Sequence, residues 1–449
     1  MAIAPLLRIA ARSVRKNLRH SVGSALAVAA GFVAIALFQG YLAYLYGDMM
    51  DHLLDRFMVG HVLVERPGLA EALEHGEPTG DLPSLGAKEQ AFVEEFLASR
   101  AGEVRARTRV RWVWGFASTG KSSTQFIALA YDVEDAAKMR RRFAWDALAG
   151  RPLQLAGPDS VVLGRGLGTL LECEPTTTAP AATPDGFPIP QERPFACRRQ
   201  RVQLVSTTKS GQLNAVEADV VGIVDGGIRD HDLKAVGMPL PLAQKLGNTD
   251  EVTYYSIALN DPAGAMSGSS RVRAFARDLD AAARARGVDV RCTRYMDNYM
   301  AEETRRGQVV LFGFRNLVGF LVVVIAGMTV LTTMAKAVAE RTREIGTLRS
   351  LGFLRRQIVA LFALEAALLA AVASAIGLAV ALGVTALVNA AGVTYDAGLM
   401  AQPFPLHLEY VPGTYVAAAA FLSAVAAVAA VLPARRAARA RIPDALTHV

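Results

Sequence analysis

Four long apolar stretches, at residues 21–46, 308–335, 357–388 and 411–432, interrupt the chain. At 1.5 Å per helical residue, each is long enough to cross a hydrocarbon layer of about 30 Å. Arg315 and Glu365 are the only charged residues within them. The pattern predicts four transmembrane helices, because the core helices of a soluble protein rarely include four runs so long and so apolar. The first run is too long for a cleaved signal peptide and is interpreted as a retained signal anchor.

Between the first two stretches, residues 47–307 have the mixed pattern of an α+β domain. Alternating, strand-like segments and helical segments form two β-α-β patterns, one in 47–115 and one in 251–307. The region between them, 116–250, is read mostly as strands and predicts an inserted β-rich subdomain. Residues 48–56 and 296–306 are predicted to be helical stalks that connect the domain to the first two spans. The predicted fold is therefore four membrane helices with a large α+β extracytoplasmic domain between spans 1 and 2.

The positive charges give this topology an orientation. Residues 1–20, the connection 336–356 and the tail 433–449 together hold 15 basic and 3 acidic residues, whereas the whole chain has a net charge of only +7. The loop 389–410 holds no Lys or Arg. The positive-inside rule therefore predicts cytoplasmic termini and an external domain outside the cytoplasm. The sequence pI of about 9.4 follows from this arrangement and does not indicate nucleic-acid binding.

One stretch resembles a nucleotide-binding loop. Gly115, Gly120, Lys121 and Ser122 match G-x-x-x-x-G-K-S, the pattern in which backbone amides and a lysine hold phosphates. That loop needs a strand before it and a helix after it, but here alternating runs lie on both sides. The predicted topology also places Lys121 away from cytoplasmic ATP. We therefore interpret the stretch as a β-hairpin turn.

The cysteines and histidines do not form an enzyme-like motif. Cys173 and Cys197 flank a Pro/Thr-rich loop, and a disulfide between them suits an oxidising compartment, with two free thiols as the alternative. Cys292 lies in an alternating strand and is expected to be a buried free thiol. His231 lies in an acidic turn, "RDHDL", which we interpret as a turn in preference to a metal site. No catalytic, cofactor or metal site is predicted.

The connection 336–356 is the most informative segment. Its pattern predicts an amphipathic helix over Val338–Ser350, with Ile345, Leu348 and Leu351 on one side and charges on the others. Gly352 is predicted to end this helix. A solvated loop would not need an ordered apolar stripe with interleaved acids, so the pattern favours a helix that docks a partner.

This segment, "ERTREIGTLRSLGFLRRQIVALFALE", resembles the coupling segment of MacB/FtsX-type ABC transporter permeases. "LLRIAARSVRKNLRH" is similar to the family's N-terminal elbow helix, here residues 1–20, and "PARRAARARIPDAL" to its tail. "VGHVLVERPG", "VVLGRGLGTLL" and "VVGIVDGGIRDHDLKAVGMPLPLAQKL" resemble parts of the external domain of lipoprotein-releasing (LolC/LolE-like) members. Two features depart from the family: no ATP-binding domain is fused to the chain, and the Cys173–Cys197 insertion replaces a short turn.

The resemblance implies a non-catalytic permease subunit in a bacterial inner membrane. A separate cytoplasmic ATPase dimer would bind ATP and Mg²⁺ and contact the coupling segment through Glu340, Arg341, Arg343, Glu344, Ile345, Leu348, Arg349 and Gly352. The implied partners are a second permease chain (identical or a paralogue), membrane lipids, an amphiphilic cargo and a periplasmic chaperone or adaptor.

Three functions remain open at this point. The first is extraction of lipoproteins from the inner membrane, as by LolCDE-like transporters. The second is MacB-like efflux or secretion of another amphiphile or peptide. The third is a regulatory permease that activates a periplasmic enzyme. An intrinsic enzyme is disfavoured because the sequence offers no catalytic constellation.

Overall fold

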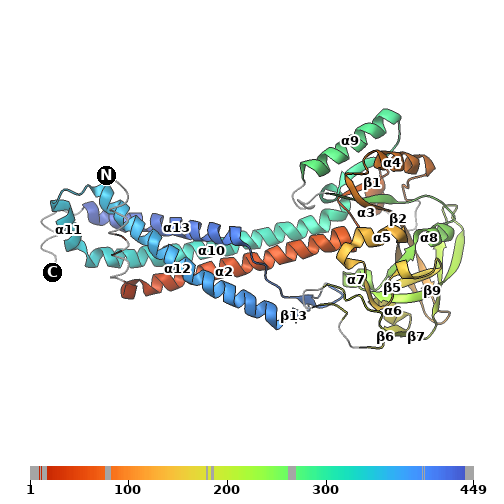
Figure 1. Cartoon of the computed structure of the whole chain (residues 1–449), viewed down its shortest axis with the longest axis horizontal. Coiled ribbons are helices and arrows are strands. Elements are labelled where there is room, and N and C mark those ends of the chain that lie inside the picture. Colours follow the sequence, from red (N-terminus) through yellow and green to blue (C-terminus); the bar gives the residue numbers. More distant parts are fainter. Residues whose placement is uncertain are drawn as a thin grey trace. The chain divides into compact units, whose positions relative to one another are not determined.

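The computed structural model describes residues 10, 12, 18–75, 82–177, 181–183, 187–260, 269–396, 398 and 400–439. The chain divides into two compact units (Figure 1). The helical unit comprises Met1–Leu45, Gln308–Gly392 and Leu406–Val449, and the sheet unit comprises Tyr46–Gly307 and Val393–Pro405. The elbow helix predicted at the N-terminus lies almost wholly outside the described residues, and so does the tail beyond residue 439.

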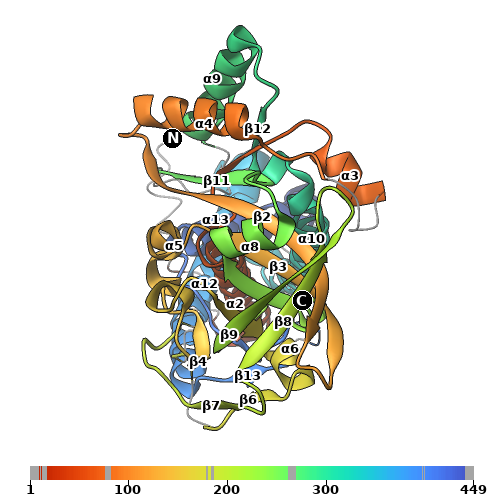
Figure 2. The ribbon, with the colours of Figure 1, turned by 90° about the vertical axis from the view of Figure 1, so that its right-hand side faces the viewer.

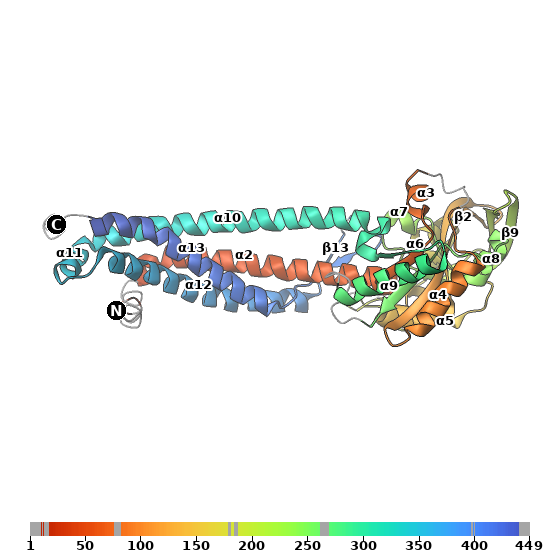
Figure 3. The same ribbon diagram turned by 90° about the horizontal axis from the view of Figure 1, so that it is seen from above.

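Four long helices carry the apolar stretches: α2 (Leu18–Asp51), α10 (Glu302–Glu340), α12 (Arg355–Ala391) and α13 (Pro412–Arg439). All four contain a segment long and apolar enough to cross a membrane, with mean hydropathies of 2.0 to 2.4. Figure 3 shows them as extended rods. The helices are longer than the apolar runs because the flanking polar residues continue the helical backbone. The predicted stalk at 48–56 is helical but changes at His52 to a π-helix, η1 (His52–Arg56).

Small side chains allow these helices to approach closely. The buried cluster of the helical unit contains Ala366, Ala370 and Ala373 of α12 and Ala426 and Ala430 of α13. A Cβ on Gly377 would lie 2.9 Å from the carbonyl oxygen of Ala29, so α2 and α12 meet nearly backbone to backbone. Packing through Gly and Ala is how helices associate in lipid, where burying apolar surface gives no advantage.

The sheet unit contains one ten-stranded sheet with the order β12-β1-β11-β2-β3-β10-β5-β9-β4, in which β8 also pairs with β2 and β9. The strands are β1 (Val62–Glu65), β2 (Val104–Ser118), β3 (Ser123–Tyr131), β4 (Ala147–Gly150), β5 (Ser160–Gly164), β8 (Arg201–Thr207), β9 (Leu213–Val224), β10 (Ala235–Pro239), β11 (Tyr254–Leu259) and β12 (Arg291–Arg294). Short helices accompany them: α3 (Leu69–His75), α5 (Val133–Arg140), α6 (Arg165–Leu170), α7 (Arg229–Asp232) and α8 (Leu240–Gly247).

The two predicted β-α-β patterns interlock. One runs β1, α4 (Ala87–Ser99), β2, and the other runs β11, α9 (Ser270–Arg286), β12. Strand β11 lies between β1 and β2, and β1 lies between β12 and β11, with every neighbouring pair antiparallel. This is the interleaving of a split β-α-β arrangement. Helices α4 and α9 lie together beside these strands (Figure 2), with the Phe96 and Phe275 rings 5.6 Å apart.

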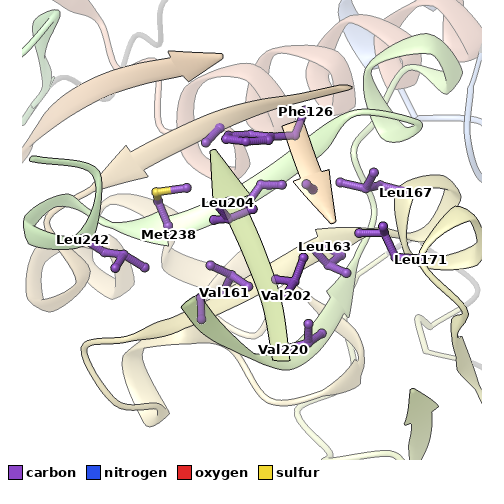
Figure 4. Close-up of a cluster of buried hydrophobic side chains, with 14 of the residues drawn as sticks. Phe126, Val161, Leu163, Leu167, Leu171, Val202, Leu204, Val220, Met238 and Leu242 are labelled. Carbon is purple, nitrogen blue, oxygen red and sulfur yellow. The ribbon is translucent and has the colours of Figure 1, made fainter. Parts of the chain in front are cut away.

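The region 116–250 is not a separate sheet. Strand β2 runs without interruption from Val104 to Ser118, pairing first with β11 and then with β8, and with β3 from Val110 onward. The predicted boundary between residues 115 and 116 is therefore wrong, since it falls inside a strand that both halves share. The core beyond this point is built from side chains such as Phe126, Leu163 and Leu204 (Figure 4).

Asp232 organises a glycine-rich junction at the end of α7. Its Oδ1 accepts the N–H of Arg165 (3.1 Å) and of Gly226 (2.7 Å), and its Oδ2 accepts the N–H of Gly166 (2.6 Å). A Cβ on Gly226 would lie 2.6 Å from the Asp232 Cα, so the close approach requires glycine there. The "RDHDL" turn is thus held by a buried carboxylate that binds backbone amides.

The segment Val393–Pro405, between α12 and α13, belongs to the sheet unit. Its ends pair as the short strands β13 (Thr394–Tyr395) and β14 (Phe404–Pro405). The Ala401 N–H donates to the Gly227 carbonyl at 2.8 Å, and Met400 forms an antiparallel bridge with Ile228. The middle of the predicted loop 389–410 is therefore tied into the sheet unit beside the Asp232 junction, whereas its two ends belong to the helical unit.

Candidate functional site

The connection between α10 and α12 is the candidate site. It contains a short helix, α11 (Thr342–Ser350), separated from α10 by a break at Arg341, whose φ and ψ are −108° and 16°. The single helix predicted over Val338–Ser350 is therefore wrong at its start, because Val338 still belongs to α10. Neither Gly nor Pro marks the break.

Gly352 stops α11, as predicted. Its φ of +94° lies in the region that favours glycine. The Gly352 N–H donates to the Arg349 carbonyl, and the Phe353 N–H reaches back to the Leu348 carbonyl, both at 3.1 Å. These bonds are of the kind that closes a Schellman-type helix end. The next helix begins at once, since the Gln357 side chain accepts the Leu354 N–H at 2.8 Å.

The apolar side of α11 faces the chain itself. Ile345 is 3% exposed and lies in a cluster with Val338, Ile358 and Phe362, while Leu348 packs against the cluster's edge. The partner contact expected for Ile345 is incompatible with this burial. Ile345 and Leu348 therefore anchor α11 to α10, α12 and α13, whereas Leu351, predicted on the same side, is exposed; periodicity alone did not distinguish anchoring from docking.

Arg341, at the break between α10 and α11, bonds to two carboxylates. Its Nε donates to Glu344 Oε2 at 2.8 Å, and its Nη1 lies 3.2 Å from both carboxylate oxygens of Glu365 on α12. The Glu365 side chain is only 8% exposed. A buried carboxylate needs a cation, and removing either partner would leave an uncompensated charge. Sequence reasoning noted Glu365 as an interruption of an apolar run but assigned it no partner.

The remaining residues form an exposed surface, hereafter the α11 surface: Arg343, Glu344, Leu351, Leu354, Arg355 and Arg356. Leu351 is 74% exposed and Leu354 is 49% exposed. Glu340 is also exposed, whereas Arg349 is half-buried beside Gly352. Two exposed leucines among arginines suit a partner with an apolar pocket rimmed by carboxylates.

The stretch that matches the nucleotide-binding pattern does not have the structure of a phosphate-binding loop. Gly115 lies within β2, and a Cβ there would sit 1.9 Å from the Val205 carbonyl oxygen. Strands β2 and β3 pair up to Ser118 and Ser123, so Lys121 lies in the hairpin turn between them. A strand follows where a phosphate-binding loop requires a helix.

The cysteines lie far from this surface in sequence and belong to the sheet unit. Cys173 in β6 (Cys173–Pro175) and Cys197 in β7 (Phe195–Cys197) form a disulfide, with their sulfurs 1.96 Å apart. Cys292 is a buried free thiol, and burial raises its pKa well above the ordinary value. Within the described ranges, no group of three or more His, Cys, Asp or Glu residues is arranged to hold a metal ion.

Comparison with known proteins finds matches to parts of this chain. Residues 316–442 match the FtsX-like permease C-terminal domain. The chain is 32% identical over 137 residues to the ABC transporter permease YtrF of Bacillus subtilis, covering 29% of this chain and 30% of that protein. It is 33% identical over 126 residues to the macrolide export ATP-binding/permease protein MacB of Brucella abortus, covering 28% of this chain and 18% of that protein. The chain thus spans less than a third of either relative.

Among solved structures, the extracellular domain of the ABC-type transporter YknZ from Gram-positive bacteria aligns with 52% of this chain and 99% of that chain. The sequence identity is 12% and the TM-score is 0.31.

Proposed function

We propose that this chain, whose residues 316–442 match an FtsX-like permease domain, is the permease subunit of an ABC transporter of the mechanotransmission type. A separate ATPase dimer would bind ATP and Mg²⁺ and dock on the α11 surface. The chain itself would supply no catalytic group. The observation that carries the proposal is an exposed, cationic and apolar surface formed by a short helix, α11, that is anchored on its buried side, and by the residues that follow it up to Arg356.

The anchoring suits a helix that transmits force. Ile345 and its neighbours fix α11 against α10, α12 and α13, and the Arg341–Glu365 pair ties the break to α12. A push on α11 would therefore move the ends of these helices together. Helix α10 continues without a break from Glu340 back to Glu302, so its first residues, up to Gly307, belong to the sheet unit. Displacement at α11 would reach that unit along one continuous helix.

The basic residues support an orientation for this proposal. They favour a bacterial inner-membrane protein with α11 and both termini in the cytoplasm and the sheet unit in the periplasm. The disulfide between Cys173 and Cys197 fits an oxidising compartment. A second permease chain, identical or a paralogue, would complete the transporter.

The proposed cargo is a lipoprotein, extracted from the membrane for delivery to the outer membrane with the help of a periplasmic chaperone. Its support is the sequence resemblance of the sheet unit to lipoprotein-releasing permeases. The second candidate is export of another amphiphile, and its support is that the Brucella relative, which matches 28% of this chain, is named a macrolide export protein. In that case a periplasmic adaptor would replace the chaperone.

The first experiment is purification of the full chain in detergent, followed by mass spectrometry of everything bound. Recovery of an ATPase together with a triacylated lipoprotein supports the proposal. Recovery of an ATPase with a periplasmic adaptor and no lipoprotein supports the export alternative. Absence of any ATPase would refute the docking role of α11.

Substitutions then test the docking surface directly. Leu351→Asp should abolish ATPase co-purification at little cost in folding, because Leu351 is 74% exposed. The matched control is Leu213→Asp, at a leucine 78% exposed in the sheet unit.

Glu344→Lys should also uncouple the permease, and Glu344→Gln separates charge reversal from loss of the Arg341 contact. Equal ATPase recovery from all four variants would contradict the assignment.

A further inference from the structure

The sheet unit contains a cavity of about 270 Å³ that the transport proposal does not use. Its floor is one face of the sheet, where Trp112 lies opposite Leu129 and Trp114 lies opposite Ile127 on β2 and β3. All four side chains are half-buried. The alternate residues of the same strands point into the closed core on the other face. The floor is therefore an apolar, partly open surface.

Two ion pairs form part of the wall. Arg56 Nη2 lies 2.9 Å from Asp225 Oδ2, and Arg140 Nη1 lies 2.6 Å from Asp146 Oδ2. Each of these side chains is no more than 12% exposed. Because each arginine has its carboxylate, these two ion pairs add no net charge to the wall. A charged ligand would bring a charge without a counter-ion into this buried wall, which is costly.

Among the described residues, three polar atoms of the lining that are not ion-paired make no hydrogen bond: the Tyr131 hydroxyl, the Trp112 indole N–H and one carboxylate oxygen of Asp146, the only one of the three that is purely an acceptor. Asp146 is 9% exposed, and its Oδ1 makes no hydrogen bond within the described part of the chain. Buried polar atoms are almost always satisfied, so such an atom at a cavity wall indicates a missing donor. A water molecule could supply that donor, but it would leave the tryptophan floor uncovered.

We propose that this cavity binds a small, uncharged, aromatic molecule or moiety that donates one hydrogen bond to Asp146. The rings of Trp112, Trp114 and Phe57 provide surfaces for stacked or edge-on contact. The cavity lies just below the usual range of small-molecule sites, about 300–1,000 Å³, which favours a compact ligand of one or two fused rings. Binding does not require an ATPase, so the proposal is independent of the transport function.

The test is titration of the full chain in detergent with 2-naphthol, an uncharged aromatic molecule with one O–H donor. The chain has three tryptophans, at positions 112, 114 and 145, all in the sheet unit, so their emission reports on this unit alone. We expect saturable quenching by 2-naphthol. Naphthalene, which lacks the donor, should bind about tenfold more weakly, since a hydrogen bond to a charged group is lost. Anionic 2-naphthoate should show no saturable quenching.

Two variants guard against a folding artefact. Ala235→Leu adds bulk at the cavity wall, and its control is Ala215→Leu on the exposed side of β9. Trp114→Ala removes part of the floor without adding bulk. Loss of saturable binding in Ala235→Leu and Trp114→Ala, with retention in Ala215→Leu, supports the site. Linear quenching that is equal in all proteins would show partition into micelles only, and saturable binding of 2-naphthoate would refute the uncharged ligand class.

Discussion

Asp232 offers a sharp test of the glycine-rich junction. Its two carboxylate oxygens accept three backbone N–H groups, those of Arg165, Gly166 and Gly226, at 2.6 to 3.1 Å. Asp232→Asn keeps the shape of the side chain but replaces one acceptor with an NH₂ group. At least one of the three backbone donors would then face another donor.

The cost can be worked from these contacts. Losing one hydrogen bond to a charged acceptor costs about 1.5–3 kcal/mol. For a domain of this size class, each kcal/mol lowers the melting temperature by about 2–4 °C, so Asp232→Asn should melt lower by about 3–12 °C. Asp232→Ala leaves all three donors unpaired, and at about 1–2 kcal/mol each the loss should be roughly 3–6 kcal/mol.

The assay is intrinsic tryptophan fluorescence during a thermal ramp at a fixed scan rate, since the three tryptophans all lie in the sheet unit. The matched control is Asp230→Asn, which makes the same change in charge at an exposed residue of the same turn. Its melting temperature should stay within about 2 °C of the wild type. If Asp232→Asn and Asp230→Asn melt together, the junction does not depend on the buried carboxylate and the reasoning is refuted.

Three further predictions concern other buried groups. Burial raises the pKa of the Glu65 carboxyl group, so this group stays protonated to higher pH in the folded chain than in the unfolded chain. The protonated carboxyl therefore contributes stability at low pH, and that contribution is lost as the pH rises through the raised pKa. Glu65→Gln should lack this loss in melts between about pH 4 and 8, and parallel pH profiles of the two proteins would contradict the assignment. Arg341→Met should lower the free energy of unfolding by about 3–5 kcal/mol, because it leaves the buried Glu365 carboxylate without a cation. Circular dichroism of the helices measures this loss, and the double variant R341M/E365M should regain most of the lost stability. Replacing Cys173 and Cys197 by Ser should lower the free energy of unfolding by about 3 kcal/mol in a denaturant titration, and a reductant should erase the difference from wild type.

Features that depend on local composition could be predicted from the sequence. The four long helices follow from the length of the apolar runs, and Gly352 follows from the need for a positive φ at a helix end. Glycines end α9 and α12 for the same reason, with Gly287 and Gly392 at φ values of 60° and 56°. The hairpin at Lys121 follows from alternation on both sides of a Gly-Lys pair.

Features that depend on contacts between residues distant in sequence could not be predicted from the sequence. The interleaving of β1 and β11 is a choice of strand partners, which alternation does not specify. At the break, Arg341 bonds to Glu365, 24 residues later, and no helix-breaking residue marks the position in the sequence. The apolar stripe through Ile345 has the same period whether it faces another chain or its own, so only the packing shows that it is internal.

The membership of Val393–Pro405 in the sheet unit has a practical consequence. The polypeptide passes between the two units at four places, so no single contiguous piece of sequence contains the whole sheet unit. A fragment cut at residues 46 and 307 would lack Met400, which bridges Ile228, and the Ala401 N–H, which donates to the Gly227 carbonyl. Joining Val393–Pro405 to such a fragment through a flexible linker would restore both contacts. That hybrid is the form in which the sheet unit should be prepared for crystallisation and partner screening.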